Sequence, residues 1–219
     1  MIYSIHPDIE KFQLFSIDGK FARKALGEDT MFHFDESPIS YSDVWKPMEL
    51  EFYISGKQKT LPIPDISQHY GRLFLNEKAY AALKDILEPC GEFLPVFHAG
   101  GTGYLFNPLA LEDNALNKDL CKKNEWGEIV WIGFNEELVT NPVFRIEYDS
   151  FFSVYCTEKF HSAYMEAELN GLVFAQYIMN EQAFKNRLKE LRCQQRDGAQ
   201  PDYVTESPIL SVFKTNDDL

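Results

Sequence analysis

Histidines, cysteines and one glycine-rich loop are the parts of this sequence whose residue types suit catalysis or ligand binding. The five histidines are scattered, and none is paired at the i and i+4 spacing by which a helix binds zinc. They are His6, His33, His69, His98 and His161. The four cysteines, Cys90, Cys121, Cys156 and Cys193, lie more than 30 residues apart. We therefore expect no metal, no cofactor, and reduced thiols in a cytoplasmic protein.

The loop at residues 98 to 104, HAGGTGY, has a composition that suits phosphate binding. It lacks the Gly-Lys-Ser/Thr ending of a P-loop, and its glycines do not have the dinucleotide-binding spacing. We therefore predict a tight turn between two strands. The sequence also has no Gly-x-Ser-x-Gly motif and gives no positive evidence for an enzyme. The enzyme alternative is a small hydrolase that uses His98 beside this loop.

Residues 151–178 provide the clearest structural pattern in the chain. An apolar strand is followed by Thr157 as a helix cap, with Glu158 in the first turn of the helix. Asn170 and Gly171 are predicted to end that helix before a second strand begins. The apolar stripe of the helix is Phe160, Ala163, Tyr164 and Ala167.

Residues 72–87 repeat the plan, with Asn76 as the cap, Glu77 in the first turn, and Pro89 after the helix. The sequence thus predicts an α+β fold: a mixed, largely antiparallel sheet with two or three packed helices, built around two similar strand-helix-strand units. We expect one domain, 1–219, with halves 1–108 and 109–200 and a loose tail, 201–219. A central strand at 129–134, a half-exposed strand at 144–148 and a last helix at 184–191 are also predicted.

The charge of the chain limits its partners. Lys and Arg number 21 and Asp and Glu 34, which gives a net charge of −13. Such a field repels nucleic acid and anionic membranes and attracts basic partners, although it also suits solubility alone. No apolar run approaches the roughly 20 residues of a membrane helix. We expect a protein partner with a basic surface, and neither nucleic acid nor membrane.

Two acidic stretches, 28–51 and 112–126, are the predicted contact surface. The first has seven acids against one lysine, with aromatic residues interleaved. Desolvated rings supply binding energy and charges supply orientation, so this pattern suits a protein interface. A solvated segment whose rings pack into the core is the alternative. The predicted partner-binding residues are Asp35, Glu36, Tyr41, Asp43, Trp45, Glu112, Asp113 and Trp126.

A series of segments distributed along the chain resembles one protein family. In order they are YSIHPDIEKF, WKPMEL, LPIPDI, GRLFLNEKAYAALKDIL, GEFLPVF, GYLFNPLALED, NPVFRIEY and VYCTEKFHSAYMEAELNGLVF. Together they resemble the Imm-type immunity proteins of bacterial polymorphic toxin systems, the eleventh numbered Imm family, formerly a domain of unknown function. The resemblance covers Tyr3 to about Ile178. The family's closing motif reads glycine, leucine, threonine, glycine, apolar, phenylalanine, and this chain keeps only its second half, Gly171 to Phe174.

The resemblance implies a cytoplasmic protein that binds a cognate toxin and neutralises it by stoichiometric inhibition. It transfers no active site, because the matching segments define a fold. Two other functions stay open from the residues alone, the small hydrolase and an adaptor or scaffold whose partner is not a toxin. The oligomeric state is not determined by the sequence.

Overall fold

The structure, a computed structural model, describes residues 1–33, 35–55, 60–125 and 129–175. Over these residues the fold is α+β, with three α-helices and mixed, mainly antiparallel sheets, as the sequence predicts. The predicted helix at 184–191 and the tail 201–219 lie outside the described residues. No helix in the described part of the chain is both long and apolar enough to span a bilayer.

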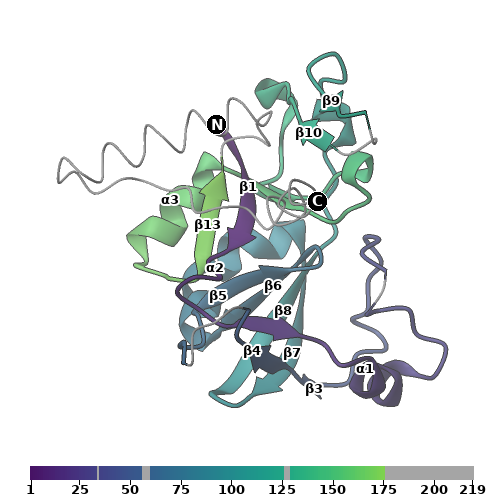
Figure 1. The fold of residues 1–219 in the computed structure, drawn as a ribbon, viewed down its shortest axis with the longest axis vertical. Helices are drawn as coiled ribbons and strands as arrows, with labels where there is room; N and C mark the ends of the chain where they lie inside the picture. The colour runs from purple at the N-terminus through teal and green to yellow at the C-terminus, as the bar shows by residue number, and fades with distance from the viewer. Residues whose placement is uncertain (34, 56–59, 126–128, 176–219) are drawn as a thin grey trace, which may run out of the picture.

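The larger sheet has five strands in the order β3-β7-β8-β6-β5 (Figure 1). The strands are β3 (Met48–Glu49), β5 (Ile66–His69), β6 (Arg72–Asn76), β7 (Gly91–His98) and β8 (Gly101–Pro108). β7 and β8 form a long antiparallel hairpin in which His98 lies opposite Gly101. The turn predicted from the glycine-rich loop is therefore confirmed. β3 pairs with β7 in the parallel direction and forms one edge of the sheet.

Both faces of this sheet are covered. Leu73 and Leu75 of β6 face the core that contains the helices, whereas Phe74 packs on the other side with Phe15 and Phe32. Alternating strand residues point to opposite faces, and here both faces are apolar, which explains the near-continuous apolar sequence of β6. The segment after α1 (Gly19–Leu26) thus lies over the sheet face opposite the helices.

The second sheet has four strands in the order β11-β12-β1-β13. They are β1 (Ile2–Pro7), β11 (Val143–Phe144), β12 (Val154–Thr157) and β13 (Leu172–Ala175). β1 is antiparallel to both of its neighbours, with Ser4 opposite Tyr155 on one side and Ala175 on the other. The N-terminal strand therefore lies in the sheet formed by the end of the described chain.

The two predicted strand-helix-strand units exist, and each belongs to a different sheet. α2 (Glu77–Leu87) connects β6 to β7, and α3 (Glu158–Glu166) connects β12 to β13. In each unit a third strand lies between the two connected strands, β8 in the first and β1 in the second. Leu83 of α2 and Phe160 of α3 share one buried core, so the two units pack through their helices.

The helix caps differ between the units. The Asn76 side chain accepts a hydrogen bond from the Ala79 amide at 2.9 Å, as predicted. Thr157 is the N-cap residue of α3, as predicted, but its side chain makes no cap hydrogen bond, so that part of the prediction is wrong. The predicted end of α3 at Asn170-Gly171 is also wrong, because the helix ends at Glu166 and Glu168 takes a left-handed conformation with φ of 50°.

The chain does not divide in space into the predicted halves. β1 pairs with β12, and Ile5, Leu73 and Val154 lie in one core. The prediction of a central strand over 129–134 is wrong in length and position, because β10 (Ile129–Trp131) ends at Trp131 and pairs with β9 (Lys122–Lys123) in a two-stranded sheet. The predicted strand at 144–148 is wrong, since β11 ends at Phe144.

The short elements are β2 (Leu14–Ser16), β4 (Glu51–Tyr53), η1 (Glu88–Cys90), η2 (Asp113–Ala115), η3 (Glu136–Leu138) and η4 (Glu147–Asp149).

Candidate partner-binding surface

Two buried arginines hold the backbone of the first acidic stretch. Arg72 is 2% exposed and Arg145 is 0% exposed. Arg72 Nη2 donates to the carbonyl of Asp35 at 2.7 Å, and Arg145 Nη1 donates to the carbonyl of Glu36. Arg145 Nη2 also donates to the Pro108 carbonyl at the end of β8. The stretch is thereby bound to the sheet through its own peptide groups, which leaves the identity of its side chains free to serve the surface.

Glu92 on β7 forms a second anchor further along the stretch. Its carboxylate accepts hydrogen bonds from the hydroxyl of Ser40 at 2.7 Å and from the amides of Tyr41 and Ser42 at 2.8 and 3.1 Å. Asn107 joins this network by donating to both Glu92 and the Ile39 carbonyl at 2.8 Å. A carboxylate that receives several donors is a strong acceptor, so residues 39–42 are held in one conformation.

The aromatic residues of the stretch serve mainly to attach it. Phe32 is buried, and the rings of Tyr41 and Trp45 meet it edge-on at 4.6 and 5.2 Å. Trp45 Nε1 donates to the Pro95 carbonyl of β7 at 2.8 Å. Tyr41 and Trp45 are therefore half-buried anchors, closer to the core-packing alternative than to free contact residues.

The exposed side chains of the same stretch are acidic and aliphatic. Met31, Ile39 and Val44 are 57%, 49% and 56% exposed. The exposed acids are Glu28, Asp29, Asp43, Glu49 and Glu51. We call residues 28–51, without the undescribed residue 34, the acidic surface. It combines negative charge with apolar contact area on a backbone that is already ordered, which lowers the entropic cost of binding.

Asp35 and Glu36, two of the predicted contact residues, are half-buried at the anchored point. Hydrogen bonds from Ser37 and, at longer range, the charges of Arg72 and Arg145 hold the pKa of Asp35 below its usual value of 3.8, although partial burial acts in the opposite direction. Asp35 is therefore ionised at neutral pH and adds to the negative field of the acidic surface.

The second predicted stretch uses its acids differently. Glu112 is 6% exposed, and its Oε1 accepts hydrogen bonds from Thr140 and Asn141, from the backbone amide and the side chain of each. Asp113 accepts from the amide of Glu147 at 2.8 Å. Glu112 thus fixes a loop inside the fold, and we leave it out of the proposed contact surface. Trp126 lies outside the described residues.

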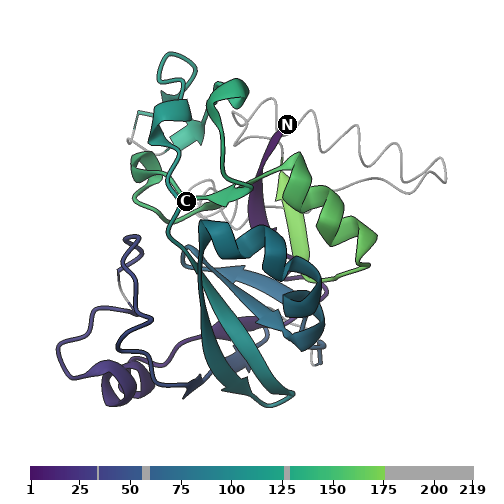
Figure 2. The same ribbon diagram turned by 180° about the vertical axis from the view of Figure 1, so that it is seen from behind.

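The two stretches do not form one continuous surface. β9 and β10, which flank the end of the second stretch, lie at one end of the long axis of the molecule, and α1, just before the first stretch, lies at the other (Figure 1, Figure 2). The predicted site therefore splits, and the first stretch keeps the larger set of exposed acidic and apolar side chains.

Sequence reasoning did not identify Arg72 and Arg145 as the residues that position the surface. The alternation of Arg145 with Phe144 and Ile146 predicts that Arg145 lies on the exposed side of a strand, whereas its side chain is buried. The available signal in the sequence is that Arg145 stands among apolar residues in Val-Phe-Arg-Ile. Arg72 precedes the buried run Leu73 to Leu75 and shares the sheet face of Phe74.

The His98 alternative finds little support in the geometry. The Gly100 amide donates to His98 Nδ1 at 3.1 Å, so the neutral ring carries its proton on Nε2, which lies 3.3 Å from the Thr102 carbonyl. The ring packs against Phe52 and Phe74. Both nitrogens therefore serve the hairpin turn. Glu77, from α2, accepts a hydrogen bond from the Thr102 hydroxyl at 2.6 Å.

The described residues form neither a metal-binding site nor a site with a reactive thiol. No group of three or more His, Cys, Asp or Glu side chains there is arranged to hold a metal ion. Cys90, Cys121 and Cys156 are free thiols, and burial raises the pKa of Cys90 and of Cys156. Such thiols are poor nucleophiles because the thiolate is disfavoured.

Comparison with known proteins adds no family. The sequence matches no protein-family model and no curated protein.

Proposed function

We propose that this chain is an immunity-type protein that binds a cognate toxin with a basic surface and neutralises it by stoichiometric inhibition. The observation that supports this best is the acidic surface. Its exposed acids and aliphatic side chains stand on a backbone fixed by Arg72, Arg145 and Glu92. A preformed acidic shape of this kind favours fast, electrostatically steered association with a basic protein.

The toxin-neutralising part of the proposal comes from the resemblance of the ordered segments to Imm-type immunity proteins, although no family model matches the chain. Stoichiometric inhibition requires only that the chain bind its partner, so this hypothesis needs no reactive group. The partner chemistry follows from the net charge of −13, which attracts a cationic macromolecule and opposes an anionic one.

The test of function is co-expression with the toxin-like product of a neighbouring gene. Rescue of growth together with co-purification of the two proteins is the expected result. Co-purification without any toxicity to rescue would instead identify an adaptor. Turnover of a small molecule by the purified chain alone would identify an enzyme and remove the proposal.

The test of the surface is a matched pair of charge reversals measured by association kinetics. Asp43→Lys, Glu49→Lys and Glu51→Lys change three exposed acids of the acidic surface, whereas Asp85→Lys, Glu137→Lys and Glu166→Lys change three exposed acids outside both predicted contact stretches. Both sets alter the net charge equally. We expect the first set to slow association at low salt by about tenfold or more and the second to have a much smaller effect. Equal effects would show that only total charge matters.

Asp35 and Glu36 are left unchanged in this experiment. Their carbonyls accept the arginine hydrogen bonds, so their replacement risks disturbing the anchored backbone as well as the charge. A change in binding would then have two explanations.

A further inference from the structure

The buried arginines carry positive charge without an anionic partner in contact. Within residues 1–33, 35–55, 60–125 and 129–175, neither Arg72 nor Arg145 forms a salt bridge. Their hydrogen bonds go to carbonyl groups, to the Asn107 side-chain oxygen and, from Arg72, to the Tyr41 side chain, and the carboxylates of Glu36 and Asp35 act on Arg72 at longer range. A buried cation is costly unless it is paired or fully hydrogen-bonded, so this pair is a place where an anion would be stabilised.

Arg72 has hydrogen-bonding capacity left over. Nη1 donates to the Tyr70 carbonyl at 3.4 Å and Nη2 to the Asp35 carbonyl at 2.7 Å, while the Phe32 ring lies 4.2 Å from the guanidinium carbon. The buried Nε of Arg72 has no acceptor among the described residues. A buried N–H without an acceptor is uncommon in folded proteins and calls for a specific explanation.

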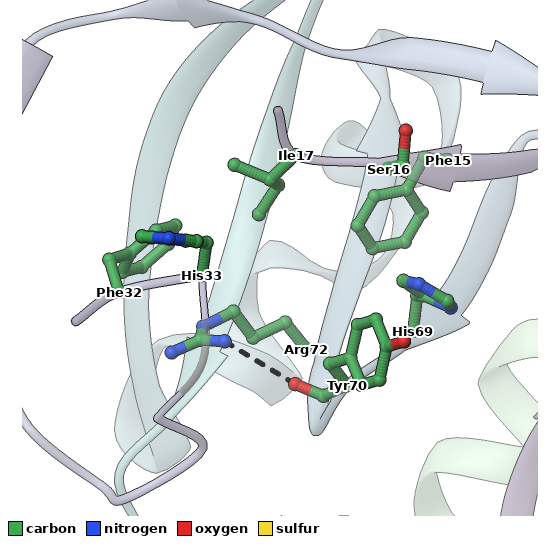
Figure 3. Close-up of a pocket in the computed structure, with 8 residues that line it drawn as sticks. All are labelled: Phe15, Ser16, Ile17, Phe32, His33, His69, Tyr70 and Arg72. Carbon is green, nitrogen blue, oxygen red and sulfur yellow. Dashed lines mark hydrogen bonds between the residues drawn. The ribbon is translucent and has the colours of Figure 1, made fainter. Parts of the chain in front are cut away.

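A cavity adjoins this guanidinium. Its volume is about 60 Å³, and Arg72, Phe15, Ile17, Phe32, His33 and His69 contribute to its walls. Figure 3 shows the guanidinium with Phe32 and His33 on one side and Tyr70 on the other, and with Ile17 and Phe15 across from it. One water needs roughly 10–15 Å³ of such space, so the cavity accommodates a group of a few heavy atoms.

The wall chemistry favours a carboxylate with a short apolar tail. Burial lowers the pKa of His69 to about 4 and also lowers the pKa of His33, so both imidazoles are neutral at pH 7. The formal charge of the lining is then that of one arginine. A monoanion suits this charge better than a phosphate dianion, which the net charge of −13 opposes more strongly. A planar carboxylate also matches the edge of a guanidinium, and Phe15 and Ile17 provide an apolar wall.

We propose that the pocket between β2, residues 32–33 and the β5–β6 turn binds the carboxylate of a short-chain organic acid, with Arg72 as its charged partner. The acid's oxygens lie against the Nε edge of Arg72 and its hydrocarbon part against Phe15 and Ile17. This proposal does not rest on toxin binding, although Phe32 and His33 belong to residues 28–51 and Arg72 also fastens the backbone of that stretch.

The test is a titration of the chain of residues 1–219 at pH 7, followed by NMR of backbone amides and arginine Nε–H groups. The probes are acetate, propionate and butyrate, with sodium chloride and phosphate at matched ionic strength. We expect saturable shifts confined to Arg72 Nε–H and to the amides around Phe15, Ile17 and His69. Shifts that are linear, spread over the surface or equal for chloride would overturn the site, and tighter binding of phosphate would overturn the ligand class.

Two variants separate the pocket from general effects. Ile17→Trp fills the cavity without changing Arg72, and Leu138→Trp places the same side chain on the exposed helix η3. We expect Ile17→Trp to weaken binding by about tenfold or more while Leu138→Trp retains it. Equal affinities in the two variants would contradict the proposal. Arg72→Lys, which keeps the charge but loses the planar edge, should also bind more weakly than the unaltered chain.

The source of the carboxylate is tested with a short peptide acid and its C-terminal amide. The proposal predicts that free short-chain acids suffice. If only the peptide acid binds, the pocket recognises a chain terminus of another protein, and the small-acid assignment is wrong.

Discussion

Both acidic stretches are rich in carboxylates, but the carboxylates have opposite roles in the two. In the acidic surface the fold supplies buried cations, Arg72 and Arg145, that bind backbone carbonyls and leave most carboxylates in solvent. In the second stretch the carboxylate of Glu112 is itself the buried anchor, receiving amide and hydroxyl donors from residues 140–141.

This difference shows how a fold creates a usable charged surface. A carboxylate that accepts internal hydrogen bonds is held away from a partner, whereas an acid on a segment anchored through its peptide groups keeps its charge available. The number of acids in a stretch is therefore a poor guide to its role. What matters is which chemical group fastens the backbone.

Arg145→Met should produce the largest effect, because it removes the cation that fastens the acidic surface. The change leaves the part-buried carbonyl of Glu36 and the buried carbonyl of Pro108 without their present donor. Removing the charge recovers part of the desolvation cost, so we expect the free energy of unfolding to fall by about 3 kcal/mol. Denaturant unfolding measures this.

Amide hydrogen exchange tests whether the effect of Arg145→Met is local to the acidic surface. Amides of residues 35–42 should exchange faster in Arg145→Met, while those near Glu112 change less. Lys118→Met, an exposed cation, is the control and should alter stability by less than about 0.5 kcal/mol. If Arg145→Met is as stable as the unaltered chain, the arginine does not fasten this surface.

The contrast between the stretches also marks the limit of sequence reasoning. The two strand-helix-strand units and the β7–β8 hairpin were predicted because caps, stripes and turn glycines are local signals. The insertion of β8 and β1 between the connected strands was not predicted, because it depends on pairing between distant segments; β1 meets β12 some 150 residues later in the chain.

The burial of polar residues was also hard to predict, because it too depends on contacts between distant segments. Arg145 and Glu112 look like exposed residues in a one-dimensional pattern. Their burial depends on Glu36, Asn107 and Thr140, which lie far from them in the sequence. Local periodicity reports the average preference of a residue type, and these positions are exceptions created by tertiary hydrogen bonds.

Glu112→Ala and Asp43→Ala test the comparison directly, since each removes one acid from one stretch. Glu112→Ala leaves two backbone amides and two side-chain donors of residues 140–141 without their acceptor, so we expect a loss of about 2 kcal/mol in the free energy of unfolding. Asp43 is exposed, and its replacement should cost less than about 0.5 kcal/mol.

Partner binding should respond in the reverse order. Asp43→Ala should slow association with a basic partner, whereas Glu112→Ala should leave the association rate of the folded protein nearly unchanged. Equal stability losses in the two variants would show that the carboxylate of Glu112 is not an anchor.

Ser37→Ala should have the smallest effect and separates the two causes that keep Asp35 ionised. Hydrogen bonding by Ser37 lowers the pKa of Asp35 most, ahead of the charges of Arg72 and Arg145. We therefore expect the pKa of Asp35 to rise toward 3.8 in Ser37→Ala, as measured from the carboxyl carbon chemical shift against pH. A carboxyl group with a lowered folded-state pKa stabilises the fold above pH 3.8 and loses that contribution as the pH falls through the folded-state pKa. The variant should therefore lose a small part of its stability at neutral pH.

The control for this prediction is Ser42→Ala, because the Ser42 amide contacts Glu92, and it should leave the pKa of Asp35 unchanged. If the pKa of Asp35 rises in Arg145→Met and stays fixed in Ser37→Ala, the buried cations would be the main cause, and the acidic surface would depend on them for its charge as well as its shape.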